Sequence, residues 1–109
     1  MKLIIAIVQD KDASQLSDQF IDANIRATKL STTGGFLKSG NTTYMIGIDD
    51  QGVDEVLAMI KEASHSREEF MTPPVNLDAS MEGTTAYPVK VQVGGATVFV
   101  MPIEKFQQF

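Results

Sequence analysis

The apolar residues of the N-terminal third follow two different periods. Leu3–Val8 is a continuous apolar run with three isoleucines, which predicts a strand buried on both faces. Apolar residues then recur at helical spacing and predict a helix over Ala13–Ala23, whose first turn Asp12 or Ser14 can cap. The following segment, Ile25–Thr33, is rich in threonine and predicts a second strand.

Glycines interrupt this pattern before a third strand and a second helix. Gly34–Asn41 contains three glycines and predicts a loop. Thr42–Asp49 alternates, which predicts a strand with one apolar face. A stripe of apolar residues that begins at Val53 then predicts a helix ending near Ser64.

The C-terminal half has a long segment without a clear period. Residues 66–86 carry prolines and few periodic apolar positions, so we expect a long surface loop, with a short strand near Phe70–Val75. Pro88–Val93 and Ala96–Met101 flank Gly94-Gly95. A two-residue glycine connection between two such runs predicts a β-hairpin.

The order of these elements is β-α-β-β-α-β with an extra C-terminal hairpin strand. It predicts an α+β, ferredoxin-like sandwich in which two helices cover one face of an antiparallel sheet. The 109 residues suffice for one domain, residues 1–109. Leu3–Val8 and Ala96–Ile103 are apolar on both sides, so the uncovered face predicts a homo-oligomer.

Composition narrows the classes of partner. A net charge of −5 argues against a nucleic-acid polymer or an anionic membrane, because both require a basic surface. The chain has no cysteine, which excludes disulfides and thiolate metal sites. The apolar run near the N-terminus is too short for a signal peptide, and no run approaches a membrane span. We therefore expect a cytoplasmic protein.

One stretch reverses the charge of the chain. Ala23–Ile48 contains no acidic residue, and Arg26, Lys29 and Lys38 give it a charge of +3, whereas the rest of the chain sums to −8. Such a local reversal favours a small anionic ligand. Gly35 to Thr42 is one substitution away from a P-loop, but Asn41 replaces the lysine and a strand follows where a helix is required.

Polar residues in this stretch are suited to a phosphate and a base. Asn24, Arg26 and Thr28 have strand spacing and share one face. Arg26 can donate two hydrogen bonds to a phosphate and Thr28 can donate one. Asn24 or Asn41 can pair with an adenine edge, and Phe36 can stack on a base. Arg26 as a solvated strand residue, and Phe36 as a loop anchor, remain alternatives.

Candidates for catalysis and for metal binding are few. His65, the single histidine, lies at the end of the second helix, where a capping side chain is the simpler interpretation. Asp10/Asp12 and Asp49/Asp50 lie at predicted helix starts, where acidic residues stabilise the helix dipole. We expect no metal, no cofactor and no enzymatic activity. A small oligomeric enzyme that uses Asp49 or His65 is the alternative.

Several segments together resemble a known family. They are the start of the chain, Thr32–Thr43, Gly47, Val93–Val100 and the terminal Phe106–Phe109. This pattern is similar to the bacterial PII-like cyclic-di-AMP receptors of the PstA type and covers nearly the whole chain except residues 66–86. The resemblance implies a homotrimer that binds cyclic di-AMP at three subunit clefts and signals to a downstream partner of unknown identity.

The resemblance also assigns roles to individual residues. Phosphate contacts are implied for Arg26, Thr28 and the loop backbone at Gly35, Phe36 and Leu37. Adenine contacts are implied for Asn41 and Gly47, while Phe99 and Gln108 are implied to close the site. The predicted ligand-binding set is therefore Asn24, Arg26, Thr28, Gly35, Phe36, Leu37, Asn41, Gly47, Phe99 and Gln108. Another adenine nucleotide such as ATP is the alternative ligand, although the stretch lacks a lysine-rich triphosphate cradle.

Overall fold

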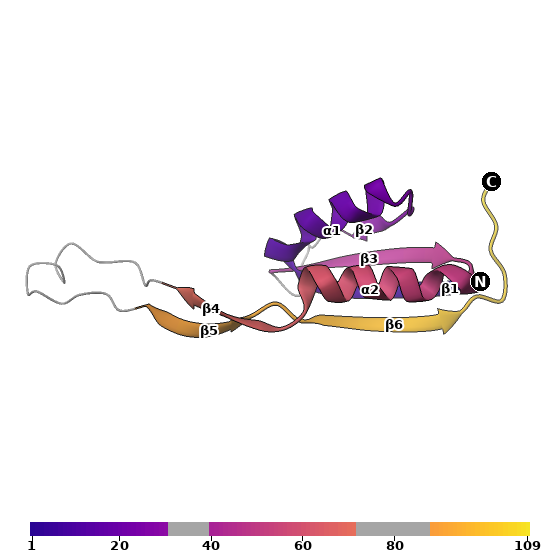
Figure 1. Cartoon of the computed structure of the whole chain (residues 1–109). Coiled ribbons are helices and arrows are strands. Elements are labelled where there is room, and N and C mark those ends of the chain that lie inside the picture. The colour runs from indigo at the N-terminus through magenta and orange to yellow at the C-terminus, as the bar shows by residue number, and fades with distance from the viewer. Residues whose placement is uncertain (31–39, 72–87) are drawn as a thin grey trace, which may run out of the picture.

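The computed structural model describes residues 1–30, 40–71 and 88–109. Figure 1 shows the arrangement of its elements. In chain order they are β1 (Lys2–Gln9), α1 (Asp10–Asp22), β2 (Thr28–Leu30), β3 (Asn41–Ile48), a 3-10 turn (Asp50–Gly52), α2 (Val53–Ser64), β4 (Arg67–Met71), β5 (Val89–Val93) and β6 (Ala96–Pro102).

The main sheet has four strands in the order β2-β3-β1-β6, and all neighbours are antiparallel. β1 lies between β3 and β6, so its apolar run has sheet neighbours on both sides. Its alternate residues Ile4, Ala6 and Val8 are buried beneath the helices. Leu3, Ile5 and Ile7 point to the other face and are only half-buried in the single chain, because no helix covers that face.

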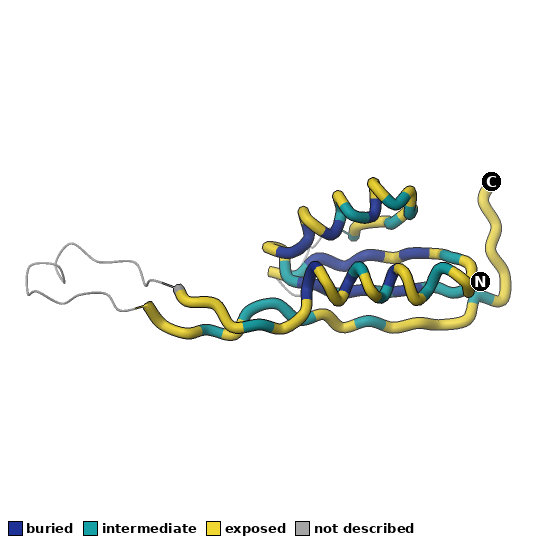
Figure 2. The backbone as a smooth tube through the Cα atoms, in the orientation of Figure 1, coloured by how far each residue is buried: buried dark blue, intermediate teal, exposed yellow. Residues whose placement is uncertain are grey.

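The two helices cover the buried face of this sheet (Figures 1 and 2). Leu16 and Phe20 of α1 and Val56 and Ile60 of α2 complete the core. The ring of Phe20 meets that of Tyr44 on β3 edge to face, with centroids 5.6 Å apart. This packing confirms the ferredoxin-like α+β class that the order of elements predicted.

The start of α1 differs from the prediction. The helix begins at Asp10 and not at Ala13, and its N-cap residue, Gln9, makes no capping bond with its side chain. Asp12 does not cap the helix either. It is buried inside the first turn and binds the guanidinium of Arg67, 55 residues away. A long-range ion pair therefore replaces the local capping contact that the sequence suggested.

The second predicted strand is shorter within the described residues. Thr28–Leu30 forms β2, whereas Ile25–Ala27 is irregular and residues 31–33 lie outside the described residues. Asn24 has a φ of 59°, and its N–H donates to the carbonyl of Ile21, which closes the end of α1. The predictions for β3 and α2 are confirmed to within one residue at each end.

The C-terminal half contains two errors of prediction. The strand Arg67–Met71 begins earlier than the short strand expected near Phe70–Val75, so residues 67–69 are strand and not loop; it pairs with β5 in a separate two-stranded sheet. The predicted hairpin at Gly94-Gly95 is wrong, because β5 pairs with β4 whereas β6 pairs with β1. The two glycines, with φ of 81° and 100°, carry the chain from one sheet to the other. We call β4 and β5 the arm; it extends beyond the helices in Figure 1.

Among the described helices, none is long and apolar enough to cross a membrane.

Candidate ligand-binding site

A groove of about 350 Å³ brings several of the predicted ligand residues together. Asn24 and Arg26 reach it from the connection between α1 and β2, and Gly47 reaches it from β3. An amide, a guanidinium and a glycine backbone thus lie side by side, as a nucleotide site requires. The complete lining is Met1, Asn24, Ile25, Arg26, Gly47, Ile48 and Asp49.

The local sequence explains why Asn24, Arg26 and Thr28 face solvent. They are exposed, and they alternate with the half-buried Ile25 and Ala27, which pack against the core. The alternation predicted from strand spacing therefore holds, although only Thr28 belongs to a strand. The two apolar side chains fix the orientation of the irregular segment, and the three polar ones are left outside.

Gly47 lies beside an apolar wall. A Cβ atom at this position would lie 3.8 Å from Met1 Cε, 3.8 Å from Phe106 Cε2 and 4.0 Å from Ile103 Cδ1. These distances are ordinary van der Waals contacts, so the glycine is not required by crowding. The C-terminal tail of the chain thus approaches the same end of β3 as the groove, through Phe106.

The sheet register separates other predicted residues within one chain. Thr28 pairs with Met45, Met45 with Ile5, and Ile5 with Phe99. Thr28 and Phe99 therefore share the open face but lie on opposite edge strands, about 14 Å apart at the usual strand spacing. Asn41 and Gly47 lie at opposite ends of β3, about 20 Å apart at the usual rise per residue.

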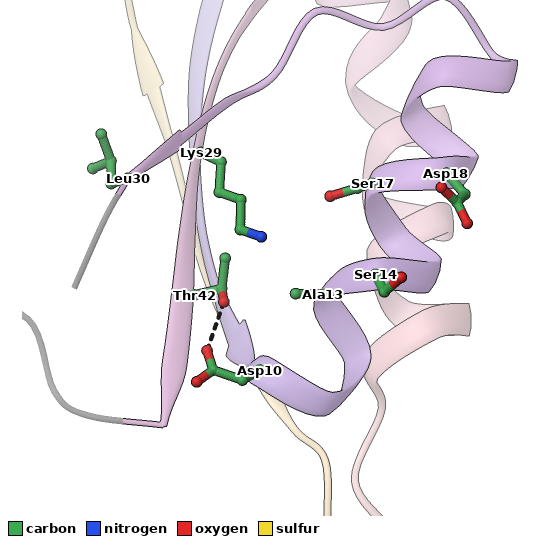
Figure 3. A pocket seen from close by; sticks show the side chains of 8 residues that line it. All are labelled: Asp10, Ala13, Ser14, Ser17, Asp18, Lys29, Leu30 and Thr42. Carbon is green, nitrogen blue, oxygen red and sulfur yellow. Dashed lines mark hydrogen bonds between the residues drawn. The ribbon is translucent and has the colours of Figure 1, made fainter. Parts of the chain in front are cut away.

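A second and larger cavity, of about 630 Å³, lies on the helix side of β2 and β3 (Figure 3). Its lining includes hydroxyls and carboxylates of α1 together with Lys29, and the Lys29 ammonium group and the Ser17 hydroxyl point toward each other across it. Thr42 Oγ1 donates a hydrogen bond of 2.6 Å to Asp10 Oδ1 at its base. Among the predicted ligand residues that the structure describes, none lines this cavity. The Lys29 charge, part of the basic stretch, therefore faces away from the groove of Arg26.

The candidate catalytic residues have structural contacts. His65 is the C-cap residue of α2, and its Nδ1 lies 3.0 Å from the carbonyl oxygen of Lys61, which confirms the capping interpretation. Asp49 precedes the 3-10 turn and lines the groove. Within residues 1–30, 40–71 and 88–109, no group of three histidine, cysteine, aspartate or glutamate side chains could hold a metal ion.

The profile of the cyclic-di-AMP receptor family matches residues 1–109, which is the whole chain. This chain belongs to the cyclic-di-AMP receptor family. It is also similar to a functionally unknown protein from Pediococcus pentosaceus ATCC 25745, known from a crystal structure. The identity is 66%, the match covers 99% of this chain and 96% of that one, and the TM-score is 0.79.

Membership of this family supports cyclic di-AMP as the ligand class but does not test the groove or its individual residues. The structure brings Asn24, Arg26 and Gly47 together and leaves Thr28, Asn41 and Phe99 elsewhere on the same chain. Gln108 lies in the exposed C-terminal tail. Gly35, Phe36 and Leu37 lie outside the described residues.

Sequence reasoning missed part of the wall of the groove. Met1, Ile48 and Asp49 line it, and Phe106 stands beside Gly47, yet none of them was predicted as a ligand residue. The paired aromatics of the tail were a usable signal for Phe106. No sequence pattern indicated Met1, because its place depends on how β1 and β3 pair at their ends.

Proposed function

We propose that this protein is a cytoplasmic second-messenger receptor that binds cyclic di-AMP without converting it. The observation that carries the proposal is the family match over the whole chain. The groove supports it chemically: Arg26 supplies a guanidinium for a phosphate, and Gly47 leaves open backbone against which a planar base can lie.

The proposed site is completed by a neighbouring subunit in a homotrimer. One chain holds Asn41 and Gly47 at opposite ends of β3, and Thr28 and Phe99 at opposite edges of the sheet. A single ligand that contacts all four residues needs a second subunit to supply some of them. The open face supports such an assembly, because Met45, Phe99 and Met101 are exposed on it.

In this proposal, Arg26 and Thr28 hold phosphate together with the backbone of Gly35, Phe36 and Leu37. Asn24 and Asn41 supply amides for the bases. Phe99 and Gln108 close the cleft. Binding then fixes the residues around the site in an arrangement that a downstream protein recognises. The ligand can only shift that arrangement by as much as its affinity for the two states differs.

Titration calorimetry with cyclic di-AMP, cyclic di-GMP and ATP tests the proposal. We expect cyclic di-AMP to bind most tightly, and chromatography of the recovered ligand to show it unchanged. Tightest binding of ATP would favour the alternative of a nucleotide-binding PII-like protein. Hydrolysis of the ligand would support the enzyme alternative. Sedimentation at several concentrations tests the trimer, and a persistent monomer would contradict the shared cleft.

A further inference from the structure

Four consecutive residues, Gln9–Asp12, connect the strand that carries Asn41 to the arm. We call them the 9–12 junction. They span the end of β1 and the first turn of α1, and each makes a long-range hydrogen bond or ion pair. The hydrogen bonds of Asp10 go to β3 and its approach, whereas the side chains of Gln9, Lys11 and Asp12 contact the arm or its base. Gln9 also lies opposite Asn41 in the register of β1 and β3.

Asp10 holds the chain on both sides of Asn41. Its N–H donates to the carbonyl oxygen of Gly40 at 2.9 Å, and its Oδ1 accepts from Thr42 Oγ1 at 2.6 Å. Thr42 is only 5% exposed, so its hydroxyl has this bond in place of contact with bulk water. Since residues of a strand alternate in direction, Asn41 points to the other face, and its position is set by its two neighbours.

The other three residues of the junction bind the arm. Lys11 Nζ lies 3.0 Å from Glu69 Oε2, and Arg67 Nη2 lies 2.8 Å from Oδ1 of the buried Asp12. Gln9 Oε1 accepts from the N–H of Gly94 at 2.7 Å, at the point where the arm leaves the main sheet. The junction is thus joined to the arm through β4, and to the residue that directly follows β5 through Gly94.

The base of the arm has little freedom to shift against these contacts. A Cβ atom at Gly94 would lie 2.5 Å from the carbonyl oxygen of His65 and 2.6 Å from Arg67 Nη1. The N–H of Gly95 donates to the carbonyl oxygen of Ser64 at 2.6 Å. Because a helical turn is stiff, a displacement of Asp10 moves Lys11 and Asp12 with it.

We propose that Asp10 is a positioning residue for Asn41 and that the 9–12 junction couples the position of Asn41 to the arm. The proposal rests on the proposed function where it concerns ligand affinity. The other part of the proposal does not depend on the ligand: the Thr42–Asp10 hydrogen bond and the contacts of the arm stabilise one another. Coupling of this kind is demonstrated by non-additive variants and not by the proximity of residues.

Calorimetry with cyclic di-AMP tests the positioning role. We expect Thr42→Val to weaken binding about fivefold, the scale of one net hydrogen bond, and Thr42→Ser to keep wild-type affinity within about twofold. Asp10→Ala should weaken binding by a similar factor. The double variant Asp10→Ala/Thr42→Val should bind cyclic di-AMP no more weakly than either single variant, because each of the three proteins lacks the same hydrogen bond.

Tyr44→Phe is the matched control. Tyr44 lies on the same strand, and its hydroxyl also joins β3 to α1, through the carbonyl of Ala13 at 2.9 Å and Ser17 Oγ at 2.6 Å. Removing this hydroxyl therefore breaks contacts between the same strand and helix, but to residues of α1 that lie outside the junction. We expect Tyr44→Phe to lower the melting temperature but to leave affinity within about twofold. Equal losses of affinity in Tyr44→Phe and Thr42→Val would overturn the positioning role.

Hydrogen exchange of the ligand-free protein tests the coupling to the arm separately. We expect Thr42→Val to speed exchange at amides of 67–71 and 89–93, and Tyr44→Phe to leave them as in wild type. Unchanged exchange in Thr42→Val would overturn the coupling. If the wild-type protein does not bind cyclic di-AMP, the proposed function is wrong. The comparison of ligand-free proteins still decides whether loss of the Thr42–Asp10 bond loosens the arm.

Discussion

The guanidinium of Arg67 holds the buried carboxylate of Asp12 with two hydrogen bonds. Nη2 donates to Oδ1 at 2.8 Å and Nη1 to Oδ2 at 3.5 Å, and Asp12 is only 4% exposed. The Arg67 side chain remains 27% exposed. The pair thus fixes the first residue of β4 against the first turn of α1, and the hydrogen bond to Asp12 raises the pKa of Arg67 above its usual value.

Removing the arginine should destabilise the protein more than removing a surface cation. Arg67→Met leaves the Asp12 carboxylate buried without its partner, and we expect a melting temperature lower by about 5–10 °C. Lys90→Met is the matched control, because Lys90 pairs with Glu68 in the same arm and both side chains are more than half exposed. It should change the melting temperature by less than about 4 °C. Equal shifts in the two variants would contradict the importance of the buried carboxylate.

Glu69 should make the stability of the arm depend on pH. A hydrogen bond from Lys11 lowers the pKa of Glu69 below its usual value, and Arg67 contributes in the same direction. A carboxylate with a depressed pKa in the folded state stabilises the fold above its unfolded pKa, and this contribution is lost as the pH falls through the folded value. After correction for the intrinsic pH dependence of exchange, the protection of the arm amides should therefore fall as the pH is lowered through the range in which Glu69 becomes protonated.

The Glu69→Gln variant checks the assignment. It cannot titrate, so after correction for the intrinsic pH dependence of exchange its arm should show a flatter profile over that range. High salt should also weaken the Lys11–Glu69 contact in the wild type, because both side chains are more than two-fifths exposed. A wild-type profile as flat as that of Glu69→Gln would show that this carboxylate contributes nothing.

The elements of the main sheet were predictable because local patterns determine them. The alternation of Tyr44, Ile46 and Ile48 places β3 against the helices, and the helical stripes of Leu16 with Phe20 and of Val56 with Ile60 define the core. The same is true of the exposed positions of Asn24, Arg26 and Thr28. Each depends only on the side chains next to it in the chain.

The arm was not predictable, because its partners are distant in the sequence. The first three residues of β4 are charged. They form a strand because β5 pairs with them and because α1 supplies Asp12 and Lys11. Gly94-Gly95 has the composition of a hairpin turn, yet Gln9 and Ser64 hold it as a crossing between two sheets. The local sequence favours a turn at these glycines, but the contacts with Gln9 and Ser64 stabilise the crossing instead.

Gly47→Ala should separate ligand binding from folding. The added methyl group makes ordinary contacts with Met1 and Phe106, so the free energy of unfolding should change by less than about 0.5 kcal/mol. The same methyl group occupies the groove where the proposed base lies. We expect affinity for cyclic di-AMP to fall about tenfold, equivalent to about 1.4 kcal/mol, as measured by calorimetry. Wild-type affinity in a stable Gly47→Ala protein would remove Gly47 from the site.

Arg26→Ala should weaken cyclic di-AMP by roughly 1.5–3 kcal/mol, the scale of a hydrogen bond to a charged group. The trimer proposed for the protein should persist in sedimentation, because Arg26 is exposed and belongs to no strand. Lys29→Ala is the matched control: it removes one positive charge from the same stretch, but Lys29 lines the opposite cavity and not the groove.

The two variants together distinguish a specific contact from general attraction of an anion. A phosphate held by the Arg26 guanidinium predicts a large loss in Arg26→Ala and a loss below about twofold in Lys29→Ala. Long-range attraction alone predicts equal losses that vanish as salt screens both charges. Titrations at two salt concentrations separate the cases, and equal effects at high salt would place the phosphate contact elsewhere than at Arg26.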